Sequence, residues 1–346
     1  MLKRTLMYAA LAAALGLSVL AWVGGNNATV NQNRNGNNGA ISQNFVNSAN
    51  ASIDQNGDNN TGNINQHDCC NPTGSITQTG NGNSAGIEQE NDAGTTATAH
   101  QNGSFNHASI TQKPGGTSGS VFSDGATATI DQNNSHNQGT IYQEGSSSSH
   151  AAVTQNTLSG TATINQVGGD NNTAGINQNN AFYTVAQIDQ TGGGNTANID
   201  QSSPTGNPYS DYSHAYISQS SDGNTATINQ WSAFTSEASI YQSGGGGHSA
   251  YVQQGSGKFL SASVNQYGSG GEGEGAGETA TILQSGEYNY AWVNQGGSGN
   301  VANINQSGLG TAESHNNATI NQIGTNNHGS ITQTGGAGNN AVISQN

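Results

Sequence analysis

The chain has 346 residues, of which 31% are hydrophobic, 7% are charged and 51 are glycines, and its formal net charge is −15. This composition excludes ordinary globular domains with large apolar cores and leaves three classes: a disordered linker, a fibrous repeat or an amyloid-like chain. Phosphate contacts need clustered Lys or Arg, which an acidic chain of this kind does not offer, so nucleic-acid binding is not expected either.

Residues 1–21 differ from the rest of the chain and are typical of a secretory signal peptide. Lys3 and Arg4 precede the apolar run LMYAALAAALGLSVLAW, and polar repeats follow with no second apolar run. The run is too short and too poorly flanked for a membrane anchor, and cleavage is expected after Ala21. We therefore expect an exported mature protein, residues 22–346, with no transmembrane segment. Three basic residues then face 20 acids, for a net charge of −17.

Two adjacent cysteines, Cys69 and Cys70, lie in the predicted turn HDCCNP. In an oxidising compartment they allow a strained vicinal disulfide, a bridge to another molecule or a free pair. His67 and Asp68 beside them raise the question of a metal site, but structural zinc takes four ligands and the sequence has no second cluster of Cys and His. We favour a decorated loop, with no metal or cofactor.

A five-residue frame recurs from one end of the chain to the other: a small residue, any residue, Ile or Val, any residue, then Gln. It can be followed through 27 copies if the degenerate copy GSVFS, which ends at Ser123, is included, and only Ala99 breaks the rule at the third position. A random polar sequence has no reason to keep this position apolar, so the pattern argues against disorder. The third positions that we expect to stack as the core ladder include Ile41, Ile53, Ile64, Ile76, Ile87, Ile164, Ile176, Ile188, Ile199, Ile304, Ile320 and Ile331.

The spacing of the copies defines two registers. Early in the chain, steps of 11 and of 12 alternate along the glutamines, so equivalent positions recur with a 23-residue period. Gly57, Gly80 and Gly103 follow the same period. The side chains that we expect to hydrogen-bond along the stack, amide to amide, are Gln43, Gln55, Gln66, Gln78, Gln89, Asn37, Asn60, Asn83 and Asn106.

Each copy has the pattern of one short β-strand. The small residue, the Ile and the Gln are spaced by two and share a face, while Thr, Ser, Asn and Asp occupy most positions between them. Turn sequences such as NGDNN and TGGGN separate the copies. A 23-residue period of strand, turn, strand and turn predicts an all-β, two-sheet β-solenoid with amyloid-like cross-β stacking. It would have roughly 13 coils and a length of ~60 Å.

Three longer connections interrupt the period, at residues 202–214, 267–279 and 307–316. We expect them to lengthen single turns and to bulge from the rod without breaking it. Glu272, Glu274 and Glu278 in the second connection lack the fixed ligand spacing of a Ca²⁺ loop, so we interpret them as a solvated acidic loop.

Solenoids that stay monomeric usually cover their terminal coils, because an open strand edge recruits another chain. Here the first copy begins soon after the predicted signal peptide, and the last, AVISQN, ends at Asn346. We therefore expect open strand edges at both ends, and a chain that stacks end to end into a fibre.

The spacing Gln-x-Gly-x-x-Asn-x-Ala-x3-Gln resembles the repeat of curlin, the amyloid subunit of bacterial curli. It occurs as QTGNGNSAGIEQ from Gln78 to Gln89, as QTGGGNTANIDQ from Gln190 to Gln201 and, with one added residue, as QVGGDNNTAGINQ. The resemblance covers nearly all of the mature chain, which carries many more repeats than a typical curlin. It implies a secreted fibre at the bacterial cell surface, used in biofilm matrix and adhesion. The partners it implies are further copies of the chain, a nucleator subunit and an outer-membrane secretion pore.

Other functions are less well supported by the residues. No Ser, His and Asp constellation and no phosphate loop stands out from the repeat, so an enzyme is not expected. The rival to a fibre subunit is a monomeric β-solenoid binding protein, either a surface adhesin or an ice-binding rod. Five outward aromatic residues allow a patch for dyes, glycans or neighbouring fibres, or else cross-strand packing, which we favour: Tyr142, Tyr216, Tyr241, Tyr251 and Trp292.

Overall fold

The computed structural model describes residues 25–90, 93–115, 125–203, 212–268 and 277–346. Within these residues the chain forms 26 β-strands and no helix, as expected for an all-β solenoid. The predicted signal peptide, residues 1–21, and the degenerate copy GSVFS lie outside the described residues.

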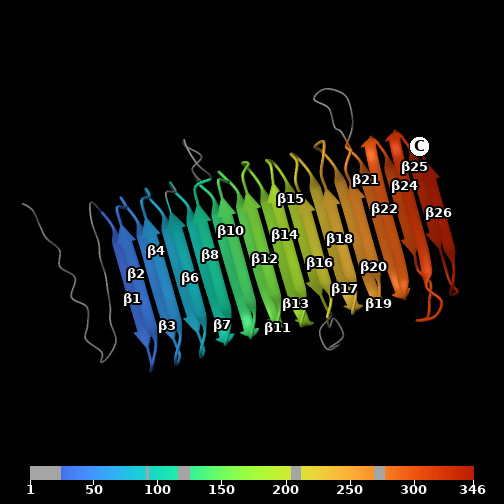
Figure 1. Cartoon of the computed structure of the whole chain (residues 1–346). Helices are drawn as coiled ribbons and strands as arrows, with labels where there is room; N and C mark the ends of the chain where they lie inside the picture. The colour runs from blue at the N-terminus through green and yellow to red at the C-terminus, as the bar shows by residue number, and fades with distance from the viewer. Residues whose placement is uncertain (1–24, 91–92, 116–124, 204–211, 269–276) are drawn as a thin grey trace, which may run out of the picture.

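The strands form two parallel sheets of 13 strands each, and the chain alternates between them (Figure 1). Sheet B contains β1 (Asn27–Asn33), β3 (Asn50–Asn56), β5 (Thr73–Thr79), β7 (Thr96–Ser104), β9 (Thr127–Ser135), β11 (His150–Leu158), β13 (Thr173–Phe182), β15 (Thr196–Ser202), β17 (Thr225–Phe234), β19 (Ser249–Lys258), β21 (Thr279–Glu287), β23 (Val301–Gln306) and β25 (His328–Gln333). Sheet A contains β2 (Asn38–Asn44), β4 (Thr61–His67), β6 (Ser84–Glu90), β8 (His107–Lys113), β10 (Gln138–Glu144), β12 (Thr161–Val167), β14 (Val185–Thr191), β16 (His214–Gln219), β18 (Glu237–Gln242), β20 (Ser261–Gln266), β22 (Asn289–Ser298), β24 (Asn316–Thr325) and β26 (Asn340–Gln345).

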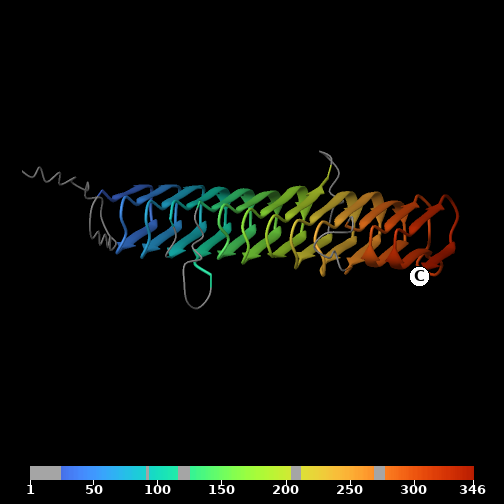
Figure 2. The same ribbon diagram turned by 90° about the horizontal axis from the view of Figure 1, so that it is seen from above.

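Seen from above, the sheets lie face to face as two layers of one straight rod (Figure 2). One strand of each sheet makes one coil, so the rod has 13 coils, and the prediction of a two-sheet β-solenoid of about 13 coils is confirmed. Because neighbouring strands lie ~4.8 Å apart, the described rod is ~58 Å long.

The register within each sheet follows the frame of the sequence. In the first pair of sheet B, Val30 lies opposite Ile53 and Gln32 opposite Gln55, one 23-residue period further along the chain. Except in the terminal strands β1 and β26, the two sheets bury the small residue, the apolar residue and the Gln of each described frame between them, and the alternate side chains face solvent. Ala99, the exception at the third position, is fully buried in the same column.

The number of coils corrects one detail of the sequence analysis. β7 pairs directly with β9, and β8 directly with β10, so the copy that ends at Ser123 has no place in either ladder. Counting it as a rung was therefore wrong. GSVFS has Ser in place of the glutamine, and without that amide it cannot join the buried hydrogen-bonded column.

The three longer connections leave the ladders in register. Ile188 pairs with Ile217 across the first connection, Val252 with Ile282 across the second and Ile304 with Ile331 across the third. Residues 204–211 and 269–276 lie outside the described residues, and so do Glu272 and Glu274. Glu278, by contrast, is described, and its side chain is fully buried instead of solvated.

Candidate functional site: the ladders, their ends and a charged cluster

The apolar column is continuous along the rod. Its members come alternately from the two sheets and meet in one core with the alanines of the frame. All twelve isoleucines named from the sequence as the core ladder lie in this column and are between 0 and 5% exposed. Burial of each such side chain contributes ~1.5–3 kcal/mol, so the column supplies most of the apolar stabilisation of an otherwise polar chain.

The glutamines form two hydrogen-bonded ladders, one in each sheet. Nε2 of Gln55 donates to Oε1 of Gln78 at 2.8 Å, and its second amide hydrogen goes to the carbonyl of Asn38 in the opposite sheet at 3.1 Å. The same donor and acceptor direction recurs at all 24 steps between neighbouring rungs, at 2.7–3.0 Å. Both ladders therefore have a polarity that runs from the first coil to the last.

The asparagine column behaves differently from the expected amide-to-amide stack. Oδ1 of Asn37 accepts the backbone N–H of Asn60 at 2.9 Å, and its Nδ2 donates to the carbonyl of Gly57 at 2.7 Å. Asn60, Asn83 and Asn106 continue the pattern. These side chains therefore satisfy the turn backbone of the next coil, as caps do at helix ends, and do not bond to one another's amides.

A second corner column was missed in the sequence analysis, and it contains two ionisable residues. Asn172, Asn195 and Asn224 link one coil to the next there. The next two positions in the column are His248 and Glu278. The backbone N–H of His248 donates to Oδ1 of Asn224. The period of the frame could have revealed this column, because each member lies six residues before the glutamine of the following strand.

His248 and Glu278 are 1% and 0% exposed, and Nδ1 of His248 lies 3.7 Å from Oε2 of Glu278. The same Nδ1 accepts the backbone N–H of Glu278 at 3.2 Å, which places the proton of the neutral ring on Nε2. Burial raises the pKa of Glu278 to about 7 and lowers the pKa of His248. Nε2 of His248 and Oε2 of Glu278 have no hydrogen-bond partner among the described residues.

The outer edges of the terminal strands are open in the described part of the chain: β1 pairs only with β3, β2 with β4, β25 with β23 and β26 with β24. At the first coil, the buried Oε1 of Gln43 has no described donor. At the last coil, Gln333 and Gln345 each give one amide hydrogen to a strand carbonyl, at 2.9 and 3.1 Å, and no described residue accepts the other. Acceptors at one end thus match donors at the other.

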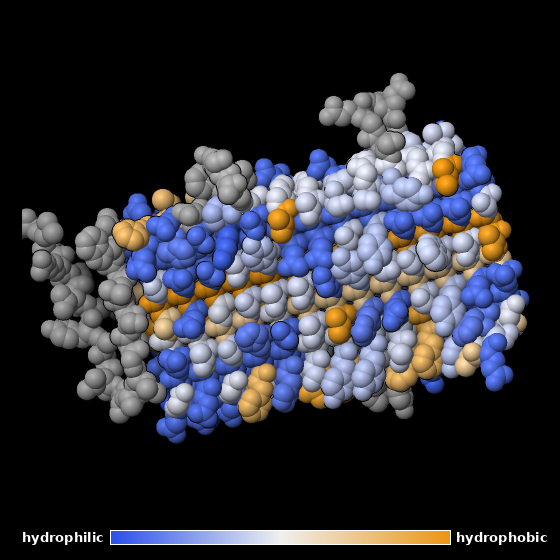
Figure 3. Space-filling model, in the orientation of Figure 1, coloured by the Kyte–Doolittle hydropathy of each residue, from blue (hydrophilic) through white to orange (hydrophobic). Residues whose placement is uncertain are grey.

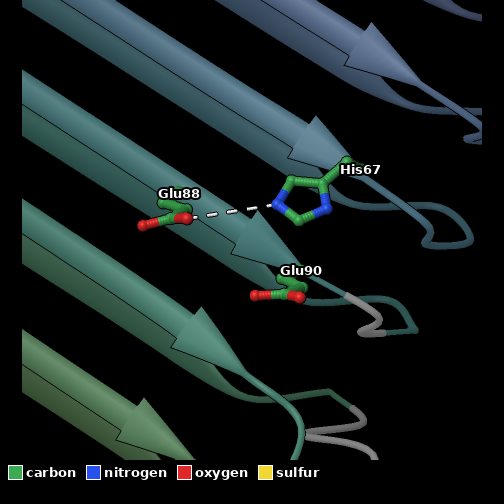
Figure 4. A group of neighbouring side chains, drawn as sticks. All are labelled: His67, Glu88 and Glu90. Atoms are coloured by element: carbon green, nitrogen blue, oxygen red, sulfur yellow. Dashed lines mark ion pairs between the residues drawn. The ribbon is translucent and has the colours of Figure 1, made fainter.

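A charged cluster lies where β4 and β6 end on sheet A (Figure 4). His67, Glu88 and Glu90 bring three ligand atoms within 4.8 Å of one another, and Nε2 of His67 is 4.0 Å from Glu88. The sequence analysis assigned no metal ligand here, although Glu90 lies one 23-residue period after His67. A side chain from the next coil completes the cluster, since Nζ of Lys113 lies 3.7 Å from Glu88 and 3.9 Å from Glu90.

The position of Lys113 bears on whether this cluster can bind a metal ion. Its ammonium faces both carboxylates and offsets one of their two negative charges, so a divalent cation would have to compete with it for the same oxygens. All four side chains are also partly exposed, which weakens both the ion pairs and any coordination by these residues. The geometry therefore supports a surface ion-pair network across three coils.

Tyr142 extends this network by one coil. Its hydroxyl donates to the carboxylate of Glu144. This hydrogen bond, burial, and the negative charges of Glu144, Glu88 and Glu90 together raise the pKa of Tyr142 to about 12.

Neither Cys69 nor Cys70 belongs to this group of possible metal ligands. Cys69 is buried with Val46 and Ala49 at the corner, Cys70 is exposed, and no disulfide joins them. Of the alternatives open from the sequence, the vicinal disulfide is absent here. Nδ1 of His67 lies 3.4 Å from Oδ2 of Asp68, and its Nε2 points to Glu88 on the neighbouring rung.

Residues 275–308 match the family model of the curlin associated repeat, which supports a curlin-like repeat family for this chain. The match spans β21, β22 and β23. Comparison with curated proteins gave no match. Among the described residues, no helix is long and apolar enough to cross a membrane. A curlin-like repeat and a β-solenoid fold fit a curli-like subunit, and both are structural features, not catalytic ones.

Proposed function

We propose that the chain is a secreted structural subunit of an extracellular curli-like amyloid fibre, with a role in biofilm matrix and adhesion and no catalytic activity. The fibre would grow at the bacterial cell surface by templated end-to-end stacking of coils. Its partners would be further copies of the chain, together with a nucleator subunit and an outer-membrane secretion pore.

The observation that carries this proposal is the complementarity of the two ends. Among the described residues, Gln32 of β1 and Gln43 of β2 donate to the next rung and turn their oxygens to the outer edge, and β25 and β26 present glutamine N–H groups at the other end. Stacking one molecule on the next would extend both sheets, continue the isoleucine column and pair these amides at the same spacing as inside the rod. No new type of interaction is needed for growth.

The proposal is tested by assembly of residues 22–346 diluted from denaturant at neutral pH. We expect sigmoidal growth of thioflavin T fluorescence, fibres in electron micrographs and shortening of the lag phase when fresh protein is seeded. A soluble β-rich monomer that never seeds would contradict the proposal and would favour the monomeric binding rod, whether adhesin or ice-binding protein.

A pair of variants on the last strand examines the stacking step. Ile343 of β26 faces the core at the open end, whereas Val342 beside it is 64% exposed on the outer face. Ile343→Lys should slow seeded growth strongly, because a buried charge would lie between two stacked molecules. Val342→Lys adds the same charge outside the ladder and should leave growth close to wild type. Equal growth of the two variants would argue against stacking through this end.

A further inference from the structure

The outer face of sheet A is mostly polar, but it has a shallow groove with two aromatic walls. The groove has a volume of about 460 Å³ and lies over β16, β18, β20 and β22. Tyr241 and Trp292 form its walls, and they are 43% and 57% exposed. The remainder of the lining is Ser218, Ser220, Gln242, Ser243, Ser263 and Asn265. Figure 3 shows one face of the rod, on which bands of apolar residues run along the rod between rows of more polar ones.

The register of sheet A explains why a groove forms at this place. One outward column runs Tyr216, Ser239, Ser263 and Trp292 on successive rungs, so two serines separate two large aromatic residues. The serines leave a notch in this column. With rungs ~4.8 Å apart, the groove walls Tyr241 on β18 and Trp292 on β22 stand two rungs, or ~10 Å, apart along the rod. Tyr241 borders the notch from the neighbouring column.

Trp292 differs from the other outward aromatic residues in its packing. Tyr216 and Tyr241 lean on each other with ring centroids 5.4 Å apart, and Tyr216 donates to Oδ2 of Asp189 at 2.8 Å. Cross-strand packing thus accounts for that pair. Trp292 makes no ring–ring contact with another described aromatic residue, and Ser263 beside it leaves its flank uncovered.

The floor of the groove is held rigid by hydrogen bonds between rungs. Oγ of Ser239 donates to Oγ of Ser263 at 3.1 Å, and Nδ2 of Asn265 donates to Oδ1 of Asn294 at 3.0 Å. These contacts leave each serine oxygen with acceptor capacity, and Asn265 with a carbonyl oxygen and a second amide hydrogen. A ligand would therefore meet fixed hydroxyl and amide groups beside an open indole face, with little entropy left to lose on the protein side.

The chemistry of the lining selects one class of ligand. No residue that lines the groove is charged, although the whole chain has a net charge of −15. A polyanion such as a nucleic acid or an acidic glycan would be repelled by the rod and would find no cation in the groove. A sugar chain without charge combines what the groove accepts: C–H faces that stack on aromatic rings, and hydroxyl groups that bond to Ser and Asn.

We propose that this groove is a binding subsite for an uncharged polysaccharide chain, with Trp292 as its stacking platform. The subsite is complete within one molecule, because all its lining residues belong to four neighbouring strands of one sheet or directly follow them. The inference therefore does not depend on fibre growth, and it is measured on freshly diluted, unassembled chain.

The test is isothermal titration calorimetry of residues 22–346 with three neutral probes, cellohexaose, laminarihexaose and chitohexaose, and with oligogalacturonate as an acidic probe. At least one neutral probe should bind, and oligogalacturonate should not. Trp292→Ala should weaken binding at least about tenfold, since stacking on one aromatic face contributes on the order of 1 kcal/mol beyond its buried area. Ser263→Phe should weaken binding similarly, because it fills the notch and leaves Trp292 in place.

Trp231→Ala is the matched control. Trp231 is also outward and 46% exposed, but it lies on β17 of sheet B, on the other face of the rod, so its removal should leave the affinity within about twofold of wild type. Circular dichroism checks that all variants fold. The proposal is overturned if no neutral probe binds at millimolar concentration, if oligogalacturonate binds as tightly as the neutral probes, or if Trp231→Ala weakens binding as much as Trp292→Ala.

Discussion

At the scale of single residues, the buried glutamine of each frame makes two kinds of hydrogen bond. One amide hydrogen goes along the ladder to the next glutamine, and the other goes across the core to a backbone carbonyl of the opposite sheet. An apolar residue of similar size would leave that carbonyl and the neighbouring amide unpaired, at a cost of ~1–3 kcal/mol for each buried group. This explains why a side chain as polar as Gln recurs at a fully buried position.

The isoleucine column leads to a prediction for Ile64 and its neighbour Asn65. Ile64 is 1% exposed, and Asn65 faces the outside of the same strand. Ile64→Asp places a carboxylate in the core with no partner, so we expect it to block or strongly slow fibre growth and to lower the unfolding midpoint. Asn65→Ser should change neither. Thioflavin T kinetics and urea unfolding of both variants provide the measurement, and equal behaviour would refute the assignment of Ile64 to the core.

The buried pair of His248 and Glu278 makes the rod sensitive to pH at one corner. The pKa of Glu278 in the folded chain, about 7, lies above its ordinary value of 4.5, so the folded chain holds a proton that the unfolded chain releases between these values. Stability from this group is therefore fully present below pH 4.5 and is lost as the pH rises through 7. His248 acts in the opposite direction, because its lowered pKa makes folding less favourable as the pH falls below 6.5.

The two groups oppose each other below pH 6.5, so we expect the unfolding free energy to fall mainly between about pH 6.5 and about pH 7. The contribution of Glu278 alone, spread over pH 4.5 to 7, is on the order of 3 kcal/mol, since one pKa unit corresponds to ~1.4 kcal/mol. The side chains that contact the pair from the coils before and after it, Asn224 and Asn300, are uncharged. Glu278→Gln keeps the shape and the bond from Asn300 without the titration, so its unfolding free energy should no longer fall between pH 6.5 and pH 7 and should rise with pH below 6.5, where His248 alone titrates. An unchanged pH slope in Glu278→Gln, measured by urea unfolding, would assign the slope to another group.

At the scale of strands and turns, the backbone of each corner is as repetitive as the core. One turn residue in each coil lies one or two positions before a strand of sheet A. It is Asn59 in one coil, with φ of 58°, and the equivalent residues in other coils have φ between 52° and 57°: Phe105, Tyr183, Phe259 and Tyr288. Positive φ is strained for such large side chains. Stacking along the corner offsets the strain, as in Phe259 and Tyr288, whose ring centroids are 4.8 Å apart with an interplanar angle of 19°.

Two glycines in neighbouring elements should respond in opposite ways to substitution by alanine. Gly80 has φ of +102°, and a Cβ there would lie 2.0 Å from the carbonyl oxygen of Gly103 in the next coil. Gly80→Ala should therefore destabilise the chain by several kcal/mol, on the order of the cost of a clash with fixed backbone plus strain. Gly86, on the outer face of β6, has open space around it, so Gly86→Ala should be neutral or stabilise by up to ~1 kcal/mol.

Urea unfolding curves of the two glycine variants give the comparison. A neutral effect of Gly80→Ala would mean that the turn can move away from the next coil, which the close stacking of these carbonyls does not allow.

The pairing of the strands can largely be predicted from the sequence, because the 23-residue period, with two strands in each repeat, indicates both the register and the number of sheets. Ile53 on Ile76 and Gln55 on Gln78 can be paired from the repeat alone. The sequence pattern could not show that asparagines bond to backbone, since the choice depends on where the turn of the next coil lies. Residue types indicated a solvated loop at Glu278, and only the spacing of six residues before the glutamine could have placed His248 and Glu278 in the buried corner column.

At the scale of the whole molecule, the rod is a stack of nearly equivalent coils with a direction. Both glutamine ladders point the same way, and each corner has its own column of side chains that bond to the following coil. A coil can therefore be removed without loss of register only if both strands and both corners leave together. Removal of one strand and one corner moves every later strand to the opposite sheet.

This difference yields a prediction for two deletions of the chain. Deletion of residues 61–83 removes β4, β5 and the turns after them, and joins Asn60 to Ser84, which follows an asparagine in the intact chain as well. Deletion of residues 61–72 removes only β4 and its turn, which moves Asn83 to the other corner and breaks its backbone bond to Oδ1 of Asn60. The stability of a solenoid is approximately a sum over neighbouring coils. The first variant should therefore lose only the contribution of one coil, whereas the second should also lose the matched corner contacts where β5 and β6 meet the coils before the deletion.

We expect the 61–83 deletion to form fibres that seed, and are seeded by, the full-length chain, with a rod shorter by ~4.8 Å per subunit. The 61–72 deletion should assemble poorly and should not cross-seed, because its frames remain intact but its corners face the wrong columns. Thioflavin T cross-seeding in both directions is the measurement. If both deletions cross-seed equally well, the frame of small residue, Ile and Gln alone would direct stacking, and the two corner columns would have no part in the register of the fibre.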